Sequence, residues 1–92
     1  MNLLRTERSV RYYNNSDEQN VGEYNIDEIP VETLFTIVIP EEDDPLLYEG
    51  QVLSREQFDK INELLIEKII PDFDLYFYVL ECYGIYDWDS KL

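Results

Sequence analysis

Carboxylates are the reactive groups that this sequence offers in quantity, and they gather in two short stretches. Residues 41–44 are Glu-Glu-Asp-Asp, with Glu49 close behind, and Asp72 and Asp74 stand two positions apart. Oxygens in such numbers can bind a hard cation or attract the cationic side chains of another protein. The spaced Asp and Asn residues around a central Gly that mark a calcium-binding loop are missing from both stretches. We therefore expect these acids to meet a basic partner, and we expect no metal or cofactor.

The balance of charge supports this expectation. The formal net charge of -14, from 21 acidic and seven basic residues, argues against direct binding to nucleic acid or to an anionic membrane. Between Tyr12 and Ser54 the chain has no lysine or arginine, so local pairing cannot neutralise its acids. Such a surface steers cationic partners, although a merely solvated face would look the same in sequence. The eleven acids of this stretch are Asp17, Glu18, Glu23, Asp27, Glu28, Glu32, Glu41, Glu42, Asp43, Asp44 and Glu49.

The usual catalytic groups are missing or have another explanation. There is no histidine, the commonest general base, and three glycines form no phosphate-binding loop. Cys82 lies in an apolar stretch and is expected to be a buried structural thiol. Ser54 begins the Ser-Arg-Glu-Gln pattern of a helix capping box, so we interpret it as a cap. A chain of 92 residues also rarely encloses a glycosidase cleft, and we expect no enzymatic activity.

The elements that position these groups begin with a β-hairpin. Residues 6–13 alternate between two faces and are rich in Thr, Val and Tyr, which predicts a strand. Residues 21–25 predict a second strand, and the polar residues 14–20 predict the turn between them. Residues 30–38 fit either a buried strand or a helix that ends before Pro40. We slightly prefer the helix, because apolar residues recur there at i, i+3, i+4 and i+7.

The second half of the chain predicts a helix followed by a long strand. Residues 72–83 carry apolar side chains on both faces, as in a central strand or one with a covered face and a contact face. Gly84 is expected to end this strand, and residues 85–92 to form a tail. We predict one α+β domain, in which the N-terminal hairpin and the C-terminal strand form a small antiparallel sheet packed against two helices. The helix, residues 55–69, presents a stripe of Phe58, Ile61, Leu65 and Ile69.

Aromatic residues are more numerous than a core of this size requires. The chain has eight Tyr, four Phe and one Trp, and Tyr and Trp are enriched where proteins contact each other. Tyr76 and Tyr78 are expected to pack within the domain. Tyr48, Tyr86 and Trp88 stand beside acids in predicted loops, where a partner contact and internal packing are equally expected. The candidate partner-binding residues are Glu41, Glu42, Asp43, Asp44, Tyr48, Glu49, Asp72, Asp74, Tyr86 and Trp88.

The order of motifs resembles a known group of proteins. RYYNNSDEQNVGEY is followed by NIDEIPVETL, then EEDDPLLY, then the predicted helix and FDLYFYVLECY. Over about residues 5–83, the chain resembles a family of small uncharacterised bacterial domains, some of which accompany polymorphic toxins as immunity proteins. DDPLLY and YFYVLECY are the most specific stretches, and neither is a catalytic motif. The resemblance implies an immunity protein and assigns no site residues.

These observations lead to one expected function and two rivals. We expect a non-enzymatic immunity or inhibitor protein that neutralises a basic partner, with a nuclease toxin as the leading candidate. A phage-type DNA mimic would use the same charge, but it requires regularly spaced acids. A structural module would instead be an accessory subunit or a weak homodimer that uses the exposed edge of the short hairpin, with apolar contacts that persist at high salt. No apolar run is long enough for a signal peptide or a membrane span, so we expect a cytoplasmic protein.

Overall fold

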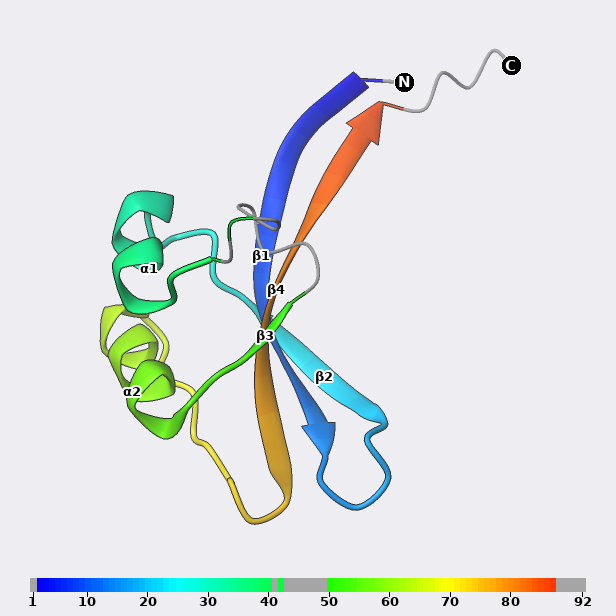
Figure 1. Ribbon diagram of the computed structural model, residues 1–92, viewed down its shortest axis with the longest axis vertical. Helices are drawn as coiled ribbons and strands as arrows, with labels where there is room; N and C mark the ends of the chain where they lie inside the picture. The colour runs from blue at the N-terminus through cyan, green and yellow to red at the C-terminus, as the bar shows by residue number, and fades with distance from the viewer. Residues whose placement is uncertain (1, 41, 43–49, 88–92) are drawn as a thin grey trace.

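The computed structural model describes residues 2–40, 42 and 50–87, and within these ranges it places side chains from residue 6 to residue 83. This part of the chain forms one antiparallel sheet in the order β2-β1-β4-β3, with α1 and α2 on the same side of it (Figure 1). The predicted α+β fold is therefore confirmed. The elements are β1 (Asn2–Asn14), β2 (Asn20–Asn25), α1 (Val31–Ile37), β3 (Gln51–Val52), α2 (Arg55–Leu64) and β4 (Tyr76–Asp87).

No helix within the described ranges has the length and apolar character needed to cross a membrane.

The first and last strands form the longest ladder of the sheet. β1 pairs with β4 from Asn2 opposite Asp87 to Asn14 opposite Tyr76, and one end of this pair extends beyond the helices (Figure 1). The prediction that Gly84 ends the strand was wrong, and the first residues of the predicted tail, 85–87, belong to β4. Gly84 pairs with Thr6 through its backbone, and a ladder needs no side chain there.

The predicted hairpin is confirmed, and its second strand is shaped by one close contact. The register between β1 and β2 shifts between Tyr12 and Tyr13, which leaves Val21 without an opposing residue. A Cβ atom added to Gly22 would lie only 2.7 Å from the Tyr12 hydroxyl oxygen and 2.9 Å from two of its ring carbons. Any side chain at this position would have to displace the Tyr12 ring, which lies directly over the glycine backbone.

The core lies between the sheet and the helices. Val10 of β1 stands opposite Leu80 of β4, and both side chains are fully buried. The Phe58 ring packs against Tyr78 with 4.7 Å between centroids. Cys82 is buried, as predicted, and the predicted stripe of Phe58, Ile61, Leu65 and Ile69 is buried in full. The other apolar residues that are buried in the described part of the chain are Ile26, Ile29, Leu34, Val38 and Leu53.

The segment that fitted either a strand or a helix is the helix α1. Pro30 precedes its first turn and accepts a hydrogen bond from the N–H of Leu34 at 3.0 Å. Leu34 and Val38 lie one turn apart and are both fully buried. The helical spacing thus places the apolar side chains toward the core, and the chain leaves the helix before Pro40.

The second helix begins where predicted and ends earlier. Ser54 and Gln57 form the reciprocal capping box. The helix stops at Leu64, and the prediction that it continues to Ile69 was wrong. The Asn62 side chain binds both the N–H and the C=O of Ile69, at 2.8 and 2.9 Å. These bonds hold residues 65–69 as an irregular segment that returns along the helix, so Leu65 and Ile69 still reach the core.

The predicted last strand also begins later than expected, because residues 73–75 form a turn. Asp72 Oδ1 accepts hydrogen bonds from the N–H groups of Asp74 and Leu75, at 3.1 and 3.2 Å. An Asp that binds the backbone of the residues after it favours a turn over an extended strand. The two-residue strand β3 pairs with β4 and adds a fourth strand to the predicted sheet, which comprised only the hairpin and the C-terminal strand.

Removing the α2 cap is expected to destabilise the domain. Ser54→Ala deletes the oxygen that accepts from the Gln57 N–H, and loss of such a cap costs about 1 kcal/mol. Ser16→Ala, at an exposed turn position, is the matched control and should shift stability by less than about 0.5 kcal/mol. Urea denaturation measures both variants. Equal free energies of unfolding for the two would contradict the assigned role of Ser54.

Candidate partner-binding surfaces

Few of the candidate residues from the sequence have a described side chain. Glu42 is exposed in a turn, and Asp72 and Asp74 are exposed before β4. Tyr86 belongs to β4, but its side chain is not among those that the structure places. The candidates that lie outside the described residues altogether are Glu41, Asp43, Asp44, Tyr48, Glu49 and Trp88.

Asp72 and Asp74 differ in what their carboxylates do. Besides its two turn contacts, Asp72 lies beside Tyr78, whose hydroxyl oxygen accepts a hydrogen bond from the Asp72 N–H at 3.0 Å. Asp72 therefore orders the turn into β4, whatever it does toward a partner. The Asp74 side chain is exposed at the tip of the same turn, next to the exposed Leu75.

The face of the sheet turned away from the helices carries a network of charged and aromatic side chains. Arg11 Nε lies 3.5 Å from Glu23 Oε2, and its guanidinium carbon lies 5.5 Å from the centroid of the Tyr83 ring. The Tyr83 hydroxyl donates to the same Glu23 oxygen at 3.4 Å and lies 3.2 Å from the Ser9 hydroxyl. Side chains along a strand point alternately to the two faces of the sheet, and these residues of β1, β2 and β4 all point to the same face.

A second part of this face is built on Tyr13. Its ring stacks on Phe77 with 5.3 Å between centroids, and its hydroxyl donates to Glu81 Oε2 at 2.6 Å. Burial lowers the pKa of the Arg11 guanidinium, but Tyr13 and the charges of Glu81 and Glu23 outweigh burial, so the net shift is upward. Glu23 and Glu81 thus already have donors or a cation beside them on this face.

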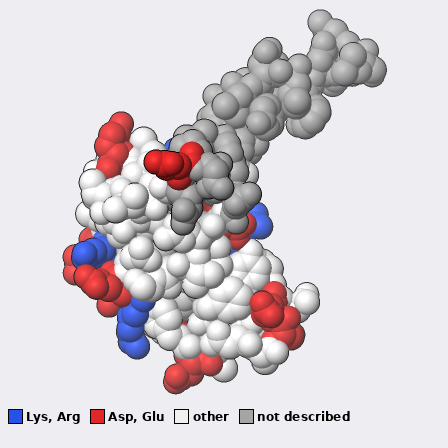
Figure 2. All heavy atoms as spheres, in the orientation of Figure 1, with Lys and Arg blue, Asp and Glu red and all other residues white. Residues whose placement is uncertain are grey.

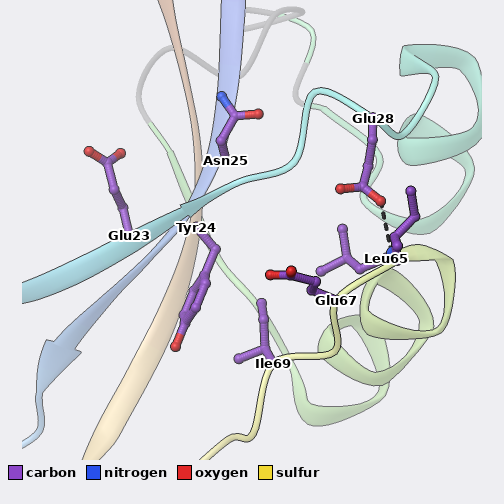
Figure 3. Close-up of a pocket in the computed structure, with 8 residues that line it drawn as sticks. Glu23, Tyr24, Asn25, Glu28, Leu65, Glu67 and Ile69 are labelled. Atoms are coloured by element: carbon purple, nitrogen blue, oxygen red, sulfur yellow. Dashed lines mark hydrogen bonds between the residues drawn. The ribbon is translucent and has the colours of Figure 1, made fainter.

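A different arrangement is found where β2 faces the segment after α2. A hollow of about 500 Å³ lies between them, with the Tyr24 ring on one side and Glu67 and Ile69 on the other (Figure 3). Its rim also includes Ile66, whose side chain is 87% exposed. The residues that line the hollow are Glu23, Tyr24, Asn25, Glu28, Leu65, Ile66, Glu67 and Ile69.

Two carboxylates define the electrostatics of this hollow. Glu28 reaches across from the segment before α1, and its Oε2 accepts the N–H of Ile66 at 2.8 Å. Glu67 points into the hollow, whereas the Glu23 side chain points away from it (Figure 3). None of the described lining residues is a lysine, an arginine or a histidine. Carboxylates beside apolar walls suit a cationic group carried on an apolar stem, as in lysine and arginine.

The Tyr24 hydroxyl belongs to the same hollow. Burial raises the pKa of this phenol by disfavouring the phenolate, and the neighbouring Tyr12 adds to the effect. The two rings stack with 5.5 Å between centroids. Tyr24 is therefore a neutral donor and a flat apolar wall at physiological pH, and it adds no further negative charge.

Sequence reasoning missed the residues of the hollow. Neither Glu28 nor Glu67 belongs to a run such as residues 41–44, since Glu28 follows the single acid Asp27 and Glu67 precedes Lys68, and the two are distant in sequence. One signal was present: Ile66 and Ile70 fall outside the apolar stripe of the predicted helix, and apolar residues with no place in a core indicate a contact surface. In the structure Ile70 is 91% exposed.

The acids visible on one face of the molecule are spread out. Figure 2 shows separate groups of Asp and Glu around the outline, with broad neutral surface between them. The described acids on this face therefore form several local sites of negative charge rather than one continuous band.

Loss of the Tyr13 hydroxyl is expected to weaken the network on the open sheet face. Tyr13→Phe removes the donor to Glu81 but keeps the ring on Phe77, and a partly exposed hydrogen bond to a charge contributes about 1 kcal/mol. The control is a double-mutant cycle with Glu81→Ala, analysed by chemical denaturation. If the two substitutions destabilise additively, the hydrogen bond contributes nothing.

Comparison with known proteins places the chain in a family. No curated protein and no solved structure matches the chain. Residues 7–81 match the family described as Domain of unknown function (DUF7683), and this range runs from within β1 to within β4 and includes α1, α2 and the hollow. Because the match covers most of the chain, the protein belongs to the DUF7683 family of domains of unknown function.

Proposed function

We propose that this domain is a non-enzymatic binding protein that neutralises a basic protein partner, in the manner of an immunity protein acting on a nuclease toxin. The observation that carries the proposal is the hollow beside β2, whose described lining includes Glu28 and Glu67 but no cationic residue. Lys68, the residue after Glu67, instead donates from its Nζ to the carbonyl oxygens of Glu63 and Leu65, at 2.8 and 2.6 Å. A protein that cleaves nucleic acid needs a cationic groove, which supplies the lysines and arginines that such a hollow suits.

The net charge of the chain supports the same partner. A formal charge of -14 accelerates encounter with a cationic protein and slows encounter with an anionic one. The apolar walls of the hollow then supply contact area that slows dissociation. The net charge and the shape of the hollow thus both favour a basic protein as the partner.

Two rival functions receive less support. A DNA mimic needs negative charge at the regular spacing of phosphates, and the visible acids lie in separate groups (Figure 2). A homo-oligomeric module would bring together copies that each carry a charge of -14, and their repulsion opposes assembly.

The proposal is tested by capture from the native host. The immobilised protein is exposed to host lysate at low salt and eluted with a salt gradient, and the eluted proteins are identified by mass spectrometry. We expect a basic protein that is released as the screening length falls to about 3 Å near 1 M salt, and that loses nuclease activity when this domain is added. Retention that persists at high salt, or a captured protein whose activity is unaffected, contradicts the proposal.

Neutralising the hollow is expected to weaken binding to the captured protein. The double substitution Glu28→Gln and Glu67→Gln removes two charges but keeps an acceptor for the Ile66 N–H. We expect an increase of about tenfold in the dissociation constant.

The matched control removes the same amount of charge elsewhere. Glu32→Gln and Asp59→Asn alter exposed positions on α1 and α2 that do not line the hollow. This control variant should bind within about twofold of the wild type, as expected for charges outside the contact area. Surface plasmon resonance compares the two pairs, and equal losses would mean that only net charge matters.

A further inference from the structure

The outer edge of β2 offers a second kind of contact beside the hollow. β2 is the last strand on its side of the sheet, and among the described residues no other strand lies beyond it. Five of its six residues are exposed. At the opposite edge, β3 is only two residues long, and very short edge strands give little length for pairing.

The direction of the backbone groups along β2 follows from one hydrogen bond. Ile26 donates its N–H to the carbonyl oxygen of Arg8 at 2.9 Å. Along an antiparallel strand, the backbone N–H and C=O groups of one residue bond to the strand on one side, and those of the next residue point to the opposite side. Tyr24, opposite Val10, therefore bonds to β1 in the same way, and the N–H and C=O groups of Glu23 and Asn25 face outward.

The usable part of this edge is short and lies next to the hollow. The unopposed Val21 interrupts the regular ladder, and such irregularities hinder pairing with another strand. The regular part of the edge runs from Gly22 to Asn25, and Glu23, Tyr24 and Asn25 also line the hollow. A strand added there would point every second side chain toward the helix side of the sheet, where the hollow lies.

We propose that an extended, lysine- or arginine-bearing segment of a protein partner adds as a strand to β2 through Glu23 and Asn25 and places a basic side chain between Glu28 and Glu67. This inference rests on the proposed function and adds the mode of binding. Backbone hydrogen bonds would supply affinity, and the hollow would select the side chain.

Charge decides between a basic partner and a second copy of this chain. A second β2 would bring one more glutamate, another Glu23, to an edge where the described lining residues include no cation. Like charges across a strand pair are destabilising, whereas opposite charges are stabilising. The occupant that complements this edge is therefore a cationic segment.

Two substitutions at one position separate the backbone contact from the charge. Glu23→Pro removes the outward N–H and leaves the bonds of Tyr24 to β1 intact, since proline is tolerated on the outer side of an edge strand. Glu23→Ala loses the same carboxylate, and with it the pair with Arg11, but keeps the N–H. Circular dichroism and thermal unfolding establish that both variants are folded.

The probe is a short synthetic peptide of alternating valine and lysine. Amide hydrogen exchange followed by NMR should show new protection at Glu23 and Asn25 when the peptide binds the wild type. Fluorescence anisotropy should show binding to Glu23→Pro that is about tenfold weaker than binding to Glu23→Ala.

The outcomes separate this inference from the proposed function. Strand addition is overturned if the peptide binds without new protection at Glu23 and Asn25, or binds the two variants with equal affinity. Either result leaves the proposal of a basic partner unaffected. Failure of the peptide to bind at low salt also overturns it, while capture of an inhibited basic protein would still support the proposed function. If strand addition is observed but no basic protein is captured from the host, the proposed function fails alone.

Discussion

The pairing of β1 with β4 is the interaction on which the rest of the structure depends. It joins the two ends of the chain, from Asn2 opposite Asp87 to Asn14 opposite Tyr76. β2 attaches to one side of this pair and β3 to the other, and the helices cover one of its faces. Closing so long a loop costs conformational entropy. The buried contact of Val10 with Leu80 and the aromatic packing around Tyr78 offset that cost.

The same pairing decides which acidic residues find internal partners. Arg11 projects from β1 onto the open face of the sheet, where Glu23 of β2 lies beside its guanidinium. On the same face, Glu81 of β4 accepts a hydrogen bond from the Tyr13 hydroxyl. Glu28 and Glu67 lie outside the sheet, in the segments before α1 and after α2. Negative charge therefore remains at the hollow because no described cation lines it.

The elements were easier to predict than the surface. The hairpin, the capping box at Ser54 and the apolar stripe from Phe58 to Ile69 follow from local periodicity and local hydrogen bonds. The end of α2 did not, because it depends on the Asn62 side chain binding the backbone of Ile69, seven residues away. The candidate site followed runs of acids in the sequence, whereas Glu28 and Glu67 come together only through folding.

By itself the sequence determined the α+β class, the excess of negative charge and the burial of Cys82 and the helix stripe. These follow from composition and from periodicities of a few residues, which act locally. Tertiary structure alone decided that β4 continues past Gly84, that β3 pairs with β4, and that Glu28 and Glu67 line the same hollow. Those outcomes depend on contacts between residues that are far apart in the chain. In the sequence, a carboxylate that only faces solvent looks the same as one that lines a site, because the two differ only in these distant contacts.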